Sequence, residues 1–103
     1  MKIKNSIKCY DNGNIECEWW HKENDTLYRH KEDGPAYTVY YKDGELLYEE
    51  WWMNNNKHRI DGPAIKEYNK HGTVSREFYF IKSNHVNSRY FNAEMKVIVI
   101  WRE

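Results

Sequence analysis

Apolar and aromatic residues alternate with polar residues along most of this chain, which is the period-two pattern of β-strands with one buried face. Glycine-containing turns interrupt the pattern at Asn12-Gly13, Asp43-Gly44 and His71-Gly72. A short helical turn is expected only near 92–94. The expected fold class is all-β: an antiparallel sheet of about seven to eight strands, twisted or curled. The predicted strands are at about 2–10, 14–21, 35–42, 46–53, 63–69, 73–81, 87–92 and 95–102.

A seven-residue motif occurs twice, 28 residues apart. Residues 30–36 read His-Lys-Glu-Asp-Gly-Pro-Ala, and residues 58–64 read His-Arg-Ile-Asp-Gly-Pro-Ala. A fixed internal period predicts one supersecondary unit stacked on copies of itself. We therefore expect stacked β-hairpins in a single domain, 1–103. Its expected parts are a partial repeat at 10–29, full repeats at 30–57 and 58–84, C-terminal capping strands at 85–103, and an inserted polar loop at 23–26.

The motif residues have expected backbone roles. Its Asp is suited to bonding backbone amides, its Gly to an unusual φ/ψ, and its Pro to beginning the next strand. We align the copies on Glu-Trp-Trp at 18–20, Glu-Trp-Trp at 50–52 and Glu-Phe-Tyr at 77–79. With this alignment, the distance from turn glycine to aromatic pair is one residue longer after Gly44, so a bulge or longer loop is expected there.

Neighbouring aromatic residues are frequent, as in Trp19-Trp20, Trp51-Trp52 and Phe78-Tyr79. Neighbours on a strand point to opposite faces, so one ring of each pair can line a core while the other lies among charged residues. The run Val97–Trp101 is continuously apolar, which predicts burial on both faces or pairing with another chain. Because one sheet of this size cannot hide both aromatic faces, we expect a homodimer.

Composition limits the function classes. The chain of 103 residues carries 16 Lys plus Arg and 16 Asp plus Glu, so no overall positive field favours nucleic acid or anionic lipid. Neither a membrane-spanning run nor a signal peptide is recognisable, and we expect a cytoplasmic protein. The two cysteines, Cys9 and Cys17, are expected to be free thiols in that setting. They would lie opposite each other across a three-residue loop, whereas a two-residue turn would place Cys9 opposite Glu16.

The sequence contains His, Asp and Glu residues that could serve catalysis or metal binding, and each group also has a structural explanation. The repeated pairs His30/Asp33 and His58/Asp61 suit an acid–base or metal site, but a pair present in every copy is more typical of a structural turn in which the histidine packs on Trp or bonds the backbone. A zinc site would need several histidines to converge, and a glycosidase-like pair would need two of the strand carboxylates. We expect neither, and predict no enzyme activity, metal or cofactor. The residues concerned are His21, His30, His58, His71 and His85, and Glu16, Glu18, Glu49, Glu50, Glu67 and Glu77.

The order of motifs resembles a variant MORN repeat over roughly residues 10–80. Gly13, Gly44 and Gly72 match the turn glycine of that family, and Trp19, Trp51 and Phe78 match its strand aromatic. The pairs His30-Lys31 and His58-Arg59 match its basic pair, whereas Asp-Gly-Pro-Ala replaces the family's Gly-x-Gly. The resemblance implies stacked β-hairpins in an elongated twisted sheet, and a scaffold, protein-binding or lipid-associated role without catalysis.

The residues favour recognition of another protein, because Trp, Tyr and Arg are enriched in interface hot spots. Size and composition also suit a small viral or mobile-element inhibitor that occupies the surface of a host protein. The alternative is a single-stranded nucleic acid or nucleotide held between Trp and Arg side chains. The predicted binding residues are Trp20, Trp52, Tyr41, Tyr79, Arg29, Arg59 and Arg76.

Overall fold

The fold is all-β, as predicted. The computed structural model describes residues 2–91 and 97–102, and every regular element in them is a strand. No helix in this part of the chain is long and apolar enough to cross a membrane. The helical turn expected near 92–94 lies outside the described residues. The strands are β1 (Ile3–Cys9), β2 (Ile15–Lys22), β3 (Asp25–Arg29), β4 (Tyr37–Tyr40), β5 (Leu46–Glu50), β6 (Trp52–Met53), β7 (Asn56–Lys57), β8 (Ile65–Tyr68), β9 (Val74–Ile81), β10 (Asn84–Phe91) and β11 (Val97–Arg102).

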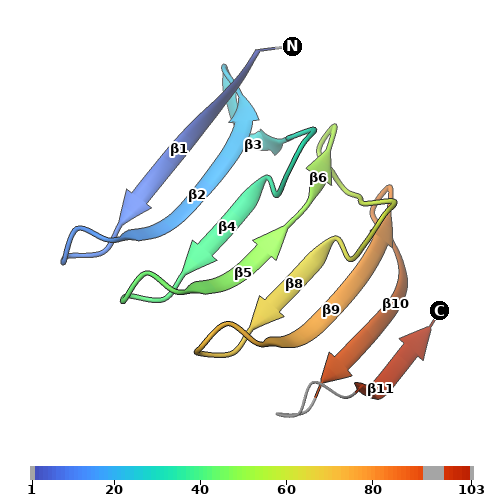
Figure 1. Cartoon of the computed structure of the whole chain (residues 1–103). Coiled ribbons are helices and arrows are strands. Elements are labelled where there is room, and N and C mark those ends of the chain that lie inside the picture. The colour runs from blue at the N-terminus through green and yellow to red at the C-terminus, as the bar shows by residue number, and fades with distance from the viewer. Residues whose placement is uncertain (1, 92–96, 103) are drawn as a thin grey trace.

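Antiparallel hairpins follow one another across a single open sheet, in the order β1-β2-β4-β5-β8-β9-β10-β11. Strand β3 pairs with β2, and β6 with β7 forms a separate two-stranded sheet. The molecule measures 41 × 35 × 17 Å, so it is a flat slab (Figure 1). Each strand of the main sheet pairs with the next one along the chain, except that β3 intervenes between β2 and β4, and β6–β7 between β5 and β8. This is the arrangement expected of stacked hairpins.

The turns at one end of the sheet differ from the prediction. The polar loop expected at 23–26 is shorter, since only residues 23–24 form a turn and Asp25 already begins β3. The hairpin β6–β7 was not expected. Its two-residue turn, Asn54-Asn55, has φ of 48° and 63°, a conformation that Asn tolerates better than most residues.

The hairpin turns at the other end of the sheet share one backbone geometry. The glycines Gly13, Gly44 and Gly72 all have positive φ, between 88° and 96°. A register shift follows in each hairpin, between β1 and β2, β4 and β5, and β8 and β9. The bulge expected only after Gly44 is therefore present in all three hairpins.

This shared bulge corrects the alignment of the aromatic residues. The backbone N–H of Trp20 donates to the carbonyl of Ala36 at 2.7 Å, and that of Trp51 donates to Ala64, also at 2.7 Å. Trp20 thus corresponds to Trp51, and by the same hydrogen-bond pattern Trp51 corresponds to Tyr79. All three lie seven residues after their turn glycine, so the assignment of Trp19, Trp51 and Phe78 to one position is wrong.

The same shift separates the cysteines. Cys9 lies opposite Ile15, and Lys8 lies opposite Cys17, so neither expected pairing is found. Both thiols are free; Cys9 is exposed and Cys17 is buried. Burial raises the pKa of the Cys17 thiol, and the neighbouring Glu16 carboxylate adds to this effect.

Each copy of the motif forms a loop whose two ends bond the backbone of one and the same earlier residue. We call residues 31–35 and 59–63 the motif loops. His30 and Ala36 both bond the backbone of Trp20, and His58 and Ala64 both bond that of Trp51. Ala36 and Ala64 are 0% exposed, which leaves no room for a larger side chain where the loops close. Where a third motif would stand, β10 continues with only a register shift between His85 and Asn87.

The motif histidines hold the next turn along the chain. His30 Nδ1 accepts the backbone N–H of Asn54 at 2.8 Å, and His58 Nδ1 accepts that of Lys82 at 3.0 Å. Both acceptors lie 24 residues before their donors, so the contact recurs with the 28-residue offset of the sequence. The expectation that these histidines bond the backbone is confirmed.

The two faces of the sheet differ. On the first, which we call the aromatic face, the cross-strand register aligns Trp19, Tyr37, Glu50, Ile65 and Phe78. The second, the motif-loop face, carries the motif loops together with Trp20, Trp51 and Tyr79. Among the described residues the buried hydrophobic side chains are small apart from one isoleucine. They are Cys17, Ala36, Ala64 and Ile65.

The turn Lys82-Ser83 is expected to limit stability, because both residues have positive φ, 48° and 67°, without being Gly or Asn. Ser83→Gly should raise the free energy of unfolding by about 0.5–1 kcal/mol by removing this conformational strain. Ser83→Ala removes the same hydroxyl but keeps the Cβ, and should give no gain. Urea denaturation of the two variants checks this; equal stabilities would contradict it.

Candidate functional site

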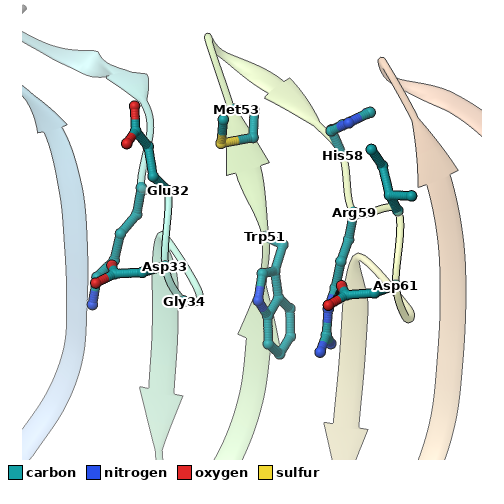
Figure 2. Close-up of a pocket in the computed structure, with 10 residues that line it drawn as sticks. Glu32, Asp33, Gly34, Trp51, Met53, His58, Arg59 and Asp61 are labelled. Carbon is teal, nitrogen blue, oxygen red and sulfur yellow. Dashed lines mark hydrogen bonds and ion pairs between the residues drawn. The ribbon is translucent and has the colours of Figure 1, made fainter.

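A groove of ≈ 700 Å³ lies on the motif-loop face between the two motif loops. Trp51, the residue between β5 and β6, lines it between the two loops, and Met53 and His58 line one end (Figure 2). A second groove of ≈ 830 Å³ lies beside the first motif loop, next to Trp20 and Ile3. The first motif loop borders both grooves, so the two copies of the motif produce adjacent, similar hollows.

Each motif loop places a basic side chain over the tryptophan whose backbone its ends bond, Trp20 or Trp51. The guanidinium carbon of Arg59 lies 4.1 Å from the ring centre of Trp51, and Lys31 Nζ lies 4.4 Å from that of Trp20. Arg59 also donates from Nε to Asp61 at 3.2 Å and from Nη1 to the carbonyl of Pro63 at 3.2 Å. These contacts fix the loop against the sheet by cation–π attraction and hydrogen bonds.

The glycine of the motif allows the basic side chain of the same loop to lie close to the backbone. Neither motif glycine has the positive φ for which glycine is usually needed; the glycines that do are Gly13, Gly44 and Gly72 at the hairpin turns. A Cβ on Gly62 would instead lie 2.8 Å from the Arg59 guanidinium carbon, whereas one on Gly34 would lie 3.5 Å from Lys31 Nζ. The basic side chain therefore lies beneath the glycine.

The expected role of the motif Asp also differs from the structure. Asp61 accepts from the side chain of Arg59. The short-range bond from an Asx side chain to a backbone amide two residues on occurs instead at Asn12 and Asp43, in turns between strands, and at Asp25, the first residue of β3.

Gly62→Ala is expected to displace Arg59 from Trp51, at a cost of about 0.5–1 kcal/mol in lost cation–π contact. Gly34→Ala should be nearly neutral, because its Cβ would make an ordinary van der Waals contact with Lys31. The Trp51 indole N–H resonance reports the displacement, and thermal unfolding reports the cost. Equal effects of the two substitutions would show that the glycines do not make room for the basic side chains.

The rim of the groove is apolar and acidic. Ile60, at the third position of the duplicated motif, is 84% exposed. The side chains of Glu32 and Asp61 are 80% and 86% exposed, and Asp33 also lines the groove. Exposed carboxylates beside an exposed isoleucine favour a ligand that offers apolar and basic groups.

The predicted binding residues do not converge on one site. Trp20 and Arg59 line the two grooves. Tyr79 is on the same face, but its hydroxyl donates to Glu77 at 3.4 Å and accepts from Arg89 at 3.3 Å. Sequence reasoning missed Trp51 and Ile60 as groove residues. The spacing of seven residues from the turn glycine identifies Trp51.

Trp52 and Arg29 lie on the aromatic face, where both contact the buried carboxylate of Glu50. Trp52 Nε1 donates to Glu50 at 2.9 Å, Arg29 Nη1 donates to it at 3.5 Å, and the Tyr48 hydroxyl donates to its second oxygen. Arg29 also covers the Tyr37 ring at 4.4 Å. Burial, and then the hydrogen bond to Glu50, raises the pKa of Tyr48. These residues stabilise the sheet.

Tyr41 and Arg76 also have structural contacts. The Tyr41 hydroxyl donates to the carbonyl of Tyr68 at 3.0 Å, which links two neighbouring hairpins, as Tyr10 does through Tyr40 at 2.6 Å. Arg76 pairs with Glu67 across β8 and β9.

The strand carboxylates and His21 have local partners. The described residues contain no group of three or more His, Cys, Asp or Glu that would suit a metal ion. His21 bonds the Ser6 hydroxyl and the carbonyl of Lys22. The other contacts of the strand carboxylates are Glu16 with Lys8, Glu18 with Asn5, Glu49 with Tyr68, Glu67 with Arg76, and Glu77 with Arg89.

Comparison with protein-family models, with curated proteins and with solved structures gives no match to this chain.

Proposed function

We propose that this chain is a protein-binding module without catalytic activity, and that its recognition site is the groove between the two motif loops. The observation that carries the proposal is Ile60, 84% exposed at the rim of a groove lined by Trp51. A large apolar side chain held by a short loop next to an aromatic ring is typical of an interface anchor.

The charges of the groove indicate the chemistry of the partner. Arg59 is paired with Asp61 and stacked on Trp51, and Lys31 is stacked on Trp20. Glu32 and Asp33 add negative charge along the first motif loop. The partner therefore offers apolar side chains accompanied by Lys or Arg.

The resemblance to MORN repeats supports the same reading, because members of that family bind proteins. A cytoplasmic inhibitor that occupies the surface of a host protein remains the form of this function that size and composition favour.

Binding of single-stranded nucleic acid is less well supported. The carboxylates of Glu32, Asp33 and Asp61 would repel phosphates, and Arg59 and Lys31 already cover the two tryptophans. We expect tryptophan fluorescence to stay flat when the protein is titrated with single-stranded oligonucleotides at low salt; saturable quenching would favour the nucleic-acid alternative.

Affinity capture with two matched variants tests the proposal. Leu27 is 85% exposed, like Ile60, but lies on β3 away from the groove. Captured partner should fall at least about 10-fold with Ile60→Asp, since a hot-spot side chain contributes about 2 kcal/mol or more, and should be unchanged with Leu27→Asp. Equal loss with both variants, or no stoichiometric partner for the unaltered chain, would refute it.

A further inference from the structure

The aromatic face is an almost continuous field of half-buried rings across β2 to β10. Tyr37 and Tyr48 meet edge to face at 6.2 Å between ring centres, and Phe78 and Tyr90 at 6.0 Å. In Figure 1 the strands form one layer, and no second layer of the described chain covers this face. The rings are Trp19, Tyr37, Tyr48, Trp52, Phe78, Phe80 and Tyr90.

A single layer leaves the chain without a conventional core. Among residues 2–91, the largest side chain that is fully buried is that of Ser88. Stable domains bury the apolar face of a sheet against a second layer, and residues 2–91 and 97–102 do not provide one. The hydrophobic driving force of these rings is therefore still available for association.

The charges in the centre of the aromatic face are compensated within the chain. Glu50 is paired with Arg29, and Glu67 with Arg76. Lys57 lies over Trp52 and Phe80 at one end of the face. A surface whose opposite charges are already paired does not repel a copy of itself. The motif-loop face differs, because the Glu32 and Asp61 side chains are 80% and 86% exposed there, and two copies of that face would bring these carboxylates together.

We propose that a second copy of this chain covers the aromatic face, so that two sheets pack face to face as a two-layer sandwich. A stable interface needs roughly 800 Å² from each partner, which a little over half of a 41 × 35 Å outline supplies. A hollow of ≈ 520 Å³ in this face, lined by Val39, Tyr48, Glu67 and Arg76, receives side chains of the second copy. The motif-loop faces then point outward on both sides of the dimer.

Sedimentation velocity of the purified chain between about 1 and 200 µM, with two matched variants, tests this. Val39→Lys places a charge in the hollow of the aromatic face, and should weaken dimerisation at least about 100-fold because the ammonium would be buried unpaired. Ile7→Lys puts the same charge on the motif-loop face, at a side chain that is 50% exposed, and should leave the dimer unchanged. Far-UV circular dichroism confirms that each variant is folded.

If Val39→Lys unfolds, Phe80→Lys, on the same face, takes its place. A monomeric unaltered chain at 200 µM would overturn the proposal. So would a dimer that persists in both folded aromatic-face variants, since it would pair through the sheet edges. A dimer that dissociates only in Ile7→Lys would place the interface on the motif-loop face and would equally overturn it.

Discussion

Glu50→Ala is expected to lower the free energy of unfolding by about 3 kcal/mol, because it leaves a cation and two donors without their acceptor. The Glu50 side chain is only 9% exposed and accepts from Trp52, Arg29 and Tyr48. Arg29 is 33% exposed, so water compensates part of the loss at that end. A sheet that fully buries so few large side chains has little reserve of stability against this change.

Urea denaturation with a matched neighbour measures the effect. Glu49 lies on the opposite face and accepts one hydrogen bond, from the Tyr68 hydroxyl at 2.6 Å. Glu49→Ala should therefore cost only about 1 kcal/mol. Glu50→Gln keeps acceptor capacity without the charge, and should fall between the two. Equal costs for Glu49→Ala and Glu50→Ala would show that the three hydrogen bonds to Glu50 stabilise the fold no more than the single hydrogen bond to Glu49.

His30→Ala is expected to cost about 2 kcal/mol, the second largest effect. His30 is 5% exposed, and its removal leaves the Asn54 N–H without an acceptor at a turn with positive φ. His58→Ala, which releases the Lys82 N–H in the same way, should cost about 1 kcal/mol because it is more exposed.

His30→Asn is the matched control, because the Asn Oδ1 lies close to the position of Nδ1 and can accept the same N–H. Hydrogen exchange of the Asn54 amide should accelerate in His30→Ala and stay slow in His30→Asn. Similar exchange in both variants would mean that the histidine does not hold the turn.

The sequence identifies the fold class and the hairpin turns because their signals are local. Alternating patterns predict strands, and Gly13, Gly44 and Gly72 stand where a turn needs positive φ. The hairpin β6–β7 was missed because its signal is weaker: Asn54 and Asn55 tolerate positive φ without requiring it, and the strands beside them have two residues each.

The candidate site was only partly predictable, because the decisive contacts are between residues of different hairpins. Trp20 and Trp52 look equivalent in sequence, yet the shared bulge places them on opposite faces. Glu50 and Phe78 occupy corresponding positions, so the carboxylate cluster belongs to one copy and periodicity does not reveal it. The role of Gly62 becomes visible only once Arg59 is seen to lie beneath it.

The division of the sheet into a recognition face and a self-association face is tested most directly by native mass spectrometry of the complex captured from a lysate of the source cells. We predict two copies of this chain with bound partner, a dimer without partner for Ile60→Asp, and a single copy that keeps its partner for Val39→Lys. Partner retained by Ile60→Asp, or an intact dimer in folded Val39→Lys, would contradict this division.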